Sequence, residues 1–94
     1  MHVLARISFK PEAAEAAKSL LARLARESRK EPGCVSYAVY QEADTPHVFR
    51  TVEEWRDAAA AATHMQSPHI AEAFAAAGPL LAAPPEILAH TSVA

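Results

Sequence analysis

Residues 2–9 follow a pattern of two alternating sets, one of which is entirely apolar. One face of a strand over these residues would carry Val3, Ala5, Ile7 and Phe9. The other face would carry His2, Leu4, Arg6 and Ser8. A period of two residues is typical of a β-strand with one strongly apolar face. The pattern therefore predicts a first strand over residues 2–9.

After Phe9 the period changes to that of a helix. Small and apolar residues recur three or four positions apart, at Ala13, Ala17, Leu20, Leu21, Leu24 and Ser28. Pro11 is tolerated in a first helical turn, and Pro32-Gly33 stops a helix. The pattern predicts an amphipathic helix between these two signals.

Two more alternating stretches predict a β-hairpin. The first has Val35, Tyr37 and Val39 on one face, alternating with Cys34, Ser36, Ala38 and Tyr40. The second covers residues 47–55, and the polar segment 41–46 between the two is rich in turn-forming residues.

The second half of the chain carries clear helix signals. Asp57 is placed to cap a helix over residues 58–65. Ser67, followed by Pro68, is placed to begin another helix over residues 68–77, which Gly78 would end. Residues 86–93 alternate again and predict a last strand.

The order β-α-β-β-α-β predicts a single α+β domain over residues 1–94, with an antiparallel sheet in the ferredoxin-like, split β-α-β arrangement. Helices from one chain cover only one face of such a sheet. The other face also carries apolar residues, namely Leu4, Val48 or Phe49, and Val35 or Cys34. A second copy of the sheet is the simplest cover, so we expect a homodimer. The alternative is an ordinary surface with scattered apolar residues.

Composition and charge narrow the choice of partners. The formal net charge is -2 and no basic cluster exists, which argues against nucleic acid and anionic membranes as partners. No apolar run approaches the roughly 20 residues that span a bilayer. The first residues lack the order of a signal peptide, and Cys34 is the only cysteine. We therefore expect a cytoplasmic protein.

Two motifs stand on either side of the predicted helix over residues 58–65. They are Phe49-Arg50-Thr51-Val52-Glu53-Glu54-Trp55 and His64-Met65-Gln66-Ser67-Pro68-His69. With Glu31-Pro32-Gly33-Cys34, Tyr37 and Pro84-Pro85-Glu86, they resemble the antibiotic biosynthesis monooxygenase family, which includes small quinol monooxygenases. The resemblance covers nearly the whole chain and is more specific for the family than for one reaction.

The resemblance implies a ferredoxin-like protomer that pairs through its sheet into a dimeric α+β barrel. It also implies a pocket between the sheet and the helices for a small hydrophobic aromatic substrate, such as a quinol or a phenol. Monooxygenases of this family use molecular oxygen without flavin, metal or haem, because the deprotonated substrate supplies the electrons.

His64 and Trp55 are the candidate catalytic residues. Histidine, with an unperturbed pKa near 6.5, suits a base that favours the phenolate form of a substrate, and His64 occupies the motif position. Trp55 offers a large apolar face and one N–H donor. The alternatives are that His64 hydrogen-bonds a carbonyl at a helix end and that Trp55 packs in the core.

Other residues are candidates for the pocket or for a structural role. The pocket wall would comprise Ala5, Ile7, Phe9, Tyr37 and Phe74, with core packing as the alternative. A structural or interface role is expected for Glu53, Phe49 and His69, the last through a hydrogen bond. A carboxylate such as Glu53 that faces a sheet must be paired, and Arg6 or Arg50 are the candidate partners.

Metal and haem chemistry are not expected. None of the five histidines has the i, i+4 spacing with a carboxylate that marks a zinc-binding helix. Haem-degrading enzymes share this fold, with a pocket Asn, a catalytic Trp and a haem-ligating His. At the corresponding positions this chain has Ala5, His64 and Phe74. Cys34 is expected to be a buried, inert thiol.

Three functions are open at this point. The first is cofactor-independent monooxygenation of a small quinol or phenolic substrate. The second is an isomerase reaction of the autoinducer-processing type on the same scaffold. The third is a non-catalytic dimer that binds a small ligand, and analogy of fold does not separate the three.

Overall fold

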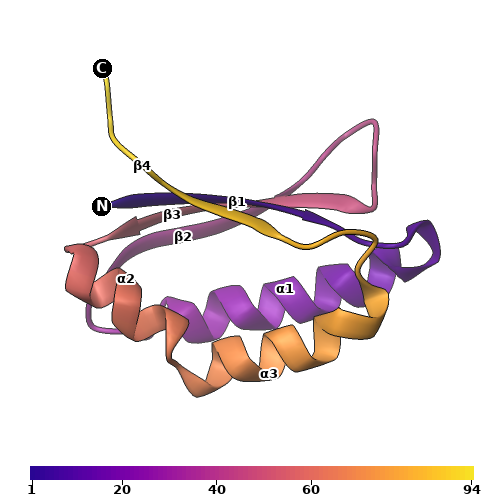
Figure 1. Ribbon diagram of the computed structural model, residues 1–94, viewed down its shortest axis with the longest axis horizontal. Helices are drawn as coiled ribbons and strands as arrows, with labels where there is room; N and C mark the ends of the chain where they lie inside the picture. The colour runs from indigo at the N-terminus through magenta and orange to yellow at the C-terminus, as the bar shows by residue number, and fades with distance from the viewer.

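The computed structural model describes residues 1–94 and has two layers, a sheet and a set of helices (Figure 1). The strands are β1 (His2–Ser8), β2 (Cys34–Gln41), β3 (Val48–Trp55) and β4 (Glu86–His90). The helices are α1 (Ala14–Ser28), α2 (Ala58–Met65) and α3 (Pro68–Ala77), with 3-10 turns at Pro11–Ala13 and Gly78–Leu80. The sheet order is β2-β3-β1-β4 and all neighbouring strands are antiparallel, which confirms the predicted ferredoxin-like α+β fold.

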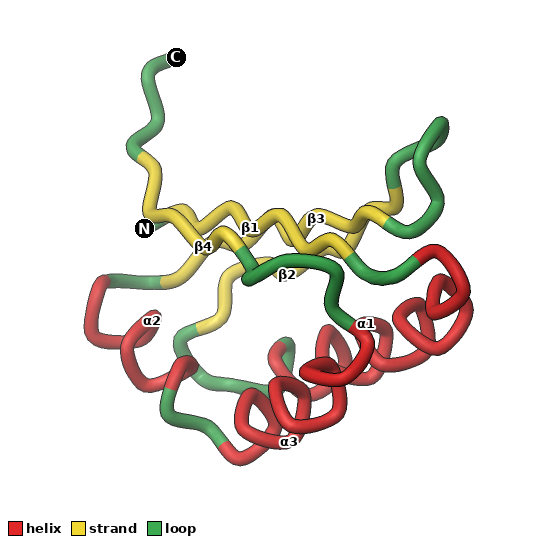
Figure 2. Tube along the Cα trace, turned by 45° about the vertical axis from the view of Figure 1, so that its right-hand side comes forward, coloured by secondary structure: helices red, strands yellow, loops and turns green.

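The three helices lie on the same side of the sheet (Figure 2). Two of them begin at the predicted caps, because the Asp57 side chain accepts from the Ala60 N–H and the Ser67 side chain accepts from the Ile70 N–H. Pro68 occupies the first turn of α3, as predicted. The cap at Ser67 separates α2 from α3 and changes the direction of the chain there.

The core lies between the sheet and the helices. Phe9 and Phe49 pack edge to face, with ring centroids 5.8 Å apart. The predicted stripe of α1 is buried against them through Ala17, Leu21, Leu24 and Ser28. Each large apolar side chain that is fully buried contributes about 1.5–3 kcal/mol, so these contacts hold the helix layer on the sheet.

The predicted alternation of β2 is wrong at its beginning. The register with β3 shifts between Cys34 and Ser36, so Val35 is an extra residue in the strand. As a result Val35 is 59% exposed, whereas Cys34 packs against the core together with Tyr37. On one side of a bulge, each residue faces the opposite side of the sheet from the one that strict alternation predicts. The alternation in the sequence does not show where a bulge lies.

The face of the sheet away from the helices is partly apolar and exposed. Leu4 pairs with Val52 on one side and with Leu88 on the other, and all three side chains are exposed. Among the other residues considered for this face, Val48 and Phe49 are buried. We call Leu4, Val52 and Leu88 the outer patch.

The alternation predicts a last strand that ends at Val93, but β4 ends at His90. Its neighbour β1 begins at His2, which pairs with His90, so residues 91–94 have no strand beside them within the chain. None of the helices combines the length and the apolar character that crossing a bilayer requires.

Candidate functional site

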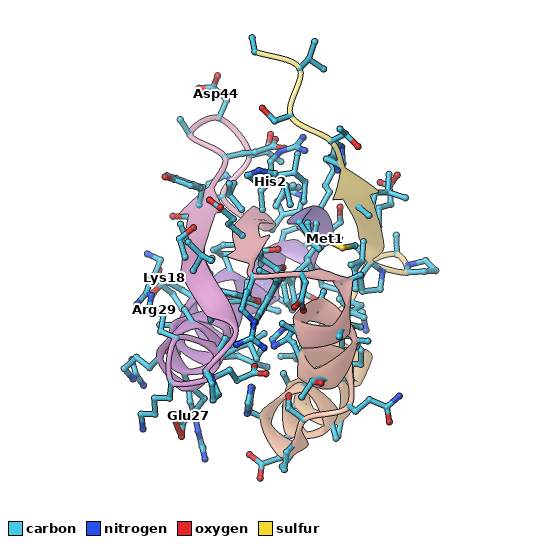
Figure 3. All side chains as sticks on the ribbon, turned by 90° about the vertical axis from the view of Figure 1, so that its left-hand side faces the viewer. Met1, His2, Lys18, Glu27, Arg29 and Asp44 are labelled. Atoms are coloured by element: carbon cyan, nitrogen blue, oxygen red, sulfur yellow. The ribbon has the colours of Figure 1, made fainter.

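A cavity of about 280 Å³ lies between the sheet and α2. β1, β3 and β4 contribute Val3, Trp55 and Ile87, among others, to its wall. Met1 also lines it, and Figure 3 shows Met1 at the end of the sheet near α2. Nine of the eleven lining residues are hydrophobic. An apolar cavity with few polar groups is typical of a site for a small organic molecule.

Small residues let α2 lie close to the neighbouring loop and leave space for the cavity. Ala58, Ala61 and Ala62 line the cavity from α2. A Cβ atom added to Gly33 would lie only 2.4 Å from Cβ of Ala60, so the close approach of α2 to the beginning of β2 requires glycine here. This gives a physical reason for the Gly33 of the Glu31-Pro32-Gly33-Cys34 motif.

His64 is a buried residue of the last turn of α2, only 2% exposed. Its ring packs on Trp55 with centroids 4.4 Å apart, and both side chains line the cavity. Nδ1 of His64 lies 2.6 Å from Oε2 of Glu31, to which it donates a hydrogen bond, and Nε2 has no hydrogen-bond partner within the chain. In the neutral ring this leaves the lone pair on Nε2, so Nε2 can accept a proton.

Glu31 connects two histidines. Its Oε2 atom also lies 2.8 Å from Nε2 of His69, and the two histidine rings have centroids 5.8 Å apart. The Cys34 N–H donates to the Glu31 carbonyl in the turn after α1, which brings this carboxylate to the break between α2 and α3. His69 therefore does make a hydrogen bond, as predicted, and its acceptor is Glu31.

Ser67 sets the relative position of the two histidines. Its N–H and its hydroxyl both donate to the His64 carbonyl, at 3.0 and 2.6 Å, while its Oγ accepts from the Ile70 N–H. One side chain thus holds the end of α2 and the beginning of α3. His64 and His69 meet the same carboxylate as a consequence.

The ligand atoms of Glu31, His64 and His69 all lie within 4.8 Å of one another, a spacing at which such groups can hold a metal ion. In this structure they are hydrogen-bonded to one another. The sequence prediction considered only pairs at i, i+4, and Glu31 is 33 positions away from His64. Spacing along the chain could not reveal this cluster.

Glu53 is the second polar group that lines the cavity, and it is 5% exposed. Its Oε2 accepts a hydrogen bond of 2.6 Å from the Thr51 hydroxyl, and its Oε1 accepts one of 3.0 Å from the Trp55 indole N–H. Glu53 takes part in none of the ion pairs of the chain. It is a buried carboxylate held by two neutral donors.

The predicted pairing of Glu53 with Arg6 or Arg50 is wrong. Both arginines extend from the opposite face of the sheet, where they pair with Glu42 at 3.8 and 3.2 Å. Side chains of a strand alternate between faces, so Arg50 and Glu53, three positions apart, point in opposite directions.

Tyr37 supports the site from the core. Its ring lies 5.7 Å from that of His64 and 6.3 Å from that of Trp55. Burial raises the pKa of Tyr37 well above its usual range, and the Glu53 carboxylate adds to the effect, so the phenol stays neutral. Cys34 is only partly buried, whereas the sequence predicts a buried thiol, but its partial burial still raises the pKa of the thiol, which favours the unreactive form.

The five residues predicted for the pocket wall do not line the cavity. Phe9 and Tyr37 are buried in the core, Ile7 packs against it, and Phe74 is 44% exposed on α3.

Ala5 faces the helices, but the cavity lies nearer to the beginning of β1, where Val3 lines it. The sequence therefore predicts the correct face of β1 for the cavity wall, but the wrong end of the strand. The two candidate catalytic residues, His64 and Trp55, do line the cavity, and so does Glu53, for which a structural or interface role is expected.

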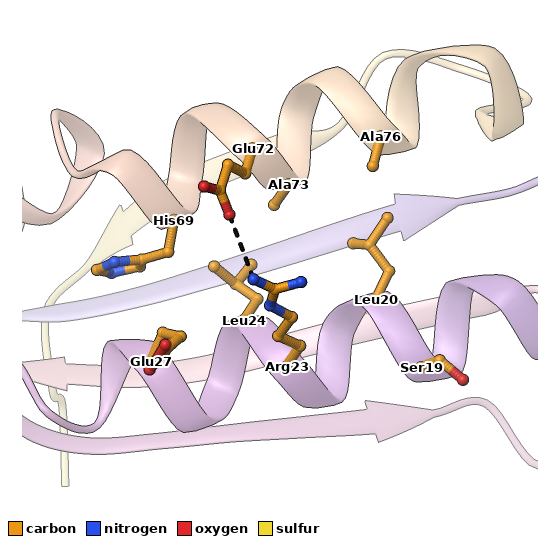
Figure 4. A pocket seen from close by; sticks show the side chains of 9 residues that line it. All are labelled: Ser19, Leu20, Arg23, Leu24, Glu27, His69, Glu72, Ala73 and Ala76. Atoms are coloured by element: carbon orange, nitrogen blue, oxygen red, sulfur yellow. Dashed lines mark ion pairs between the residues drawn. The ribbon is translucent and has the colours of Figure 1, made fainter.

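A second depression of about 320 Å³ lies between α1 and α3 (Figure 4). Arg23 and Glu72 form an ion pair of 3.7 Å across it, and Glu27 and His69 lie near one end. Its charged side chains are exposed and paired with one another or with Lys30. The cavity beside α2 is therefore the better candidate for a functional site.

Residues 1–76 match the family model described as antibiotic biosynthesis monooxygenase. The chain belongs to the antibiotic biosynthesis monooxygenase family. A Mycobacterium tuberculosis relative named "Putative monooxygenase Rv0793" is 35% identical over 82 residues, which are 87% of this chain and 80% of that protein. The structure of Rv0793 is similar to this one with a TM-score of 0.86, at 34% identity, over 99% of this chain and 96% of that one.

Two further comparisons agree with this family. A solved antibiotic biosynthesis monooxygenase has a TM-score of 0.93 and 26% identity, over 99% of this chain and 98% of that one. The Synechocystis protein sll1783 is 36% identical over 85 residues, 90% of this chain. This chain spans only 58% of the length of that relative.

Proposed function

We propose that the protein is a cofactor-independent monooxygenase that acts on a small phenolic or quinol substrate in the cavity beside α2. The observation that carries the proposal is the environment of His64. Its buried ring lines an apolar cavity, Glu31 orients it through Nδ1, and Nε2 has no partner in the chain. Membership of the family and the name of the relative Rv0793 support oxygenase chemistry.

An imidazole that a carboxylate holds through Nδ1–H is well arranged to act as a base at Nε2. His64 would take the proton of a substrate hydroxyl, and the resulting anion would supply electrons to oxygen. For a quinol, the balanced reaction converts quinol and O₂ to hydroxyquinone and water. Oxidation of the quinol to the quinone and hydroxylation of a C–H bond together supply the four electrons, so no other reductant is needed.

The apolar wall would hold the ring of the substrate and exclude water. Val3 of β1, Trp55 of β3 and Ile87 of β4 all line the cavity from the sheet. The volume of about 280 Å³ is just below the usual range for small-molecule sites, about 300–1,000 Å³. This size favours a substrate of one or two rings.

We further propose that the protein works as a homodimer in the cytoplasm. The outer patch of Leu4, Val52 and Leu88 is continuous across β1, β3 and β4, and a second copy of the same sheet would cover it. The single free Cys34 is compatible with a reducing compartment.

Oxygen consumption with a panel of quinols and phenols tests the proposed reaction. The wild-type protein should consume oxygen faster than the spontaneous rate with at least one substrate. His64→Ala should fall to the spontaneous rate, and His47→Ala, a control outside the cavity, should match the wild type. A wild-type rate equal to the spontaneous rate across the panel would overturn the proposal. Anaerobic turnover would then favour an isomerase, and binding without product would favour a ligand-binding protein.

A further inference from the structure

Glu53 is the most deeply buried carboxylate of the chain. An ionised carboxylate offers about four lone-pair sites, and burial of a charge is costly unless hydrogen bonds or a cation compensate for it. Only Thr51 and Trp55 donate to Glu53, and neither carries a charge. The carboxylate therefore has acceptor capacity that the chain itself does not use.

The unused capacity belongs to a group that lines the cavity. Trp55 connects it to the candidate base, because the indole N–H donates to Glu53 and the indole ring packs on His64. The two polar groups of the cavity are thus placed around one indole. Both groups line the same cavity of about 280 Å³, so a small ligand bound there would lie near both.

We propose that Glu53 is a specificity-determining residue that accepts a hydrogen bond from a second donor group of the substrate, while the reacting hydroxyl faces His64. The inference rests on the proposed function, since it uses the same cavity and the same base. The second donor can be a hydroxyl or an amine, because an ionised carboxylate only accepts. A ligand without it would leave Glu53 under-satisfied in a site that excludes water.

Calorimetric titration in the absence of oxygen tests this assignment. The ligands are 1,4-dihydroxybenzene, 4-aminophenol and 4-methoxyphenol, which keep one hydroxyl and differ in the group opposite to it. The wild-type protein should bind the first two about tenfold or more tightly than the methyl ether, the factor expected for a hydrogen bond to a charged acceptor. Quenching of Trp55, the only tryptophan, gives a second measure of binding in the cavity.

Glu53→Gln is the informative variant, because the amide has nearly the same shape but can present N–H groups to the ligand. It should lose the preference for a second donor and bind 4-methoxyphenol at least as well as the wild type does. Glu54→Gln is the matched control, since it makes the same chemical change at the next position of β3, outside the cavity, and leaves Glu53 and its two donors unchanged; it should keep the preference. Circular dichroism verifies that each variant is folded.

Equal affinities of the wild-type protein for the three ligands would overturn the assignment, and this comparison needs no variant. A preference that persists in Glu53→Gln would overturn it as well. The outcome is separate from that of the proposed reaction. Oxygen consumption without a donor preference would support His64 as the base and overturn the role of Glu53. A donor preference without oxygen consumption would support the role of Glu53 and overturn the proposed reaction.

Discussion

Nδ1 of His64 lies 2.6 Å from Oε2 of Glu31, although 33 positions separate the two residues in the sequence. The contact forms because the turn after α1 and the break between α2 and α3 meet at the same place. It gives one buried histidine a defined orientation at the wall of an apolar cavity. The chemistry proposed for the protein depends on this pair.

Glu31→Gln should lower kcat by about 10-fold or more, because the variant loses the carboxylate that orients the His64 ring. KM should change little, because Glu31 does not line the cavity. Steady-state kinetics with the best quinol of the panel measure both values. Glu72→Gln, which removes an exposed carboxylate of α3, is the control and should match the wild type. A kcat of Glu31→Gln equal to that of the wild type would show that the pair does not assist the reaction.

Gly33→Ala should lower the free energy of unfolding by about 1–3 kcal/mol, because the new methyl group would overlap with Ala60 and push α2 away. Gly78→Ala is the matched control, since an added Cβ there meets nothing within 4 Å and the backbone is already helical. The control should be neutral or slightly stabilising. Urea unfolding measures the free energy of unfolding of both variants. Equal values would show that the close approach of α2 to Gly33 does not affect stability.

The stability of the protein should fall at alkaline pH through Tyr37. Its pKa is raised in the folded state, so its contribution is complete below the unfolded value near 10 and decreases as the pH rises beyond that value. Tyr37→Phe removes this contribution. The free energy of unfolding, measured from pH 8 to 11, should therefore decline less steeply in the variant. Parallel curves for the two proteins would contradict the assignment.

Sedimentation of the wild-type protein at micromolar concentration should give twice the chain mass of 10.1 kDa. Val52→Asp places a charge in the outer patch and should shift the equilibrium to the monomer. Ala75→Glu, an exposed substitution on α3, should remain dimeric. A folded wild-type monomer at this concentration would show that the outer patch does not pair two copies.

The elements could be predicted from the sequence because each signal lies within a few residues of the structure it determines. The alternation of β1 and the caps at Asp57 and Ser67 are of this kind. The bulge at Val35 is not, because it depends on how two strands pair.

The site was less predictable because it depends on tertiary packing. Trp55 and His64 do line the cavity, but their predicted chemical roles remain predictions. Glu31 belongs to a recognised motif, yet nothing in its spacing indicates that it meets two histidines. The sequence predicts an arginine partner for Glu53, whereas its two donors are the Thr51 hydroxyl and the Trp55 indole, each two positions away on the same face of β3.

The central claim is that His64 ionises a substrate that then reacts directly with molecular oxygen. Turnover under isotopically labelled dioxygen in unlabelled water, followed by mass spectrometry, tests it most directly. One labelled atom should appear in the product and the other in water, and His64→Ala should form no product above the spontaneous amount. A product whose new oxygen atom comes from water, or one that His64→Ala forms as fast as the wild type, would contradict the account.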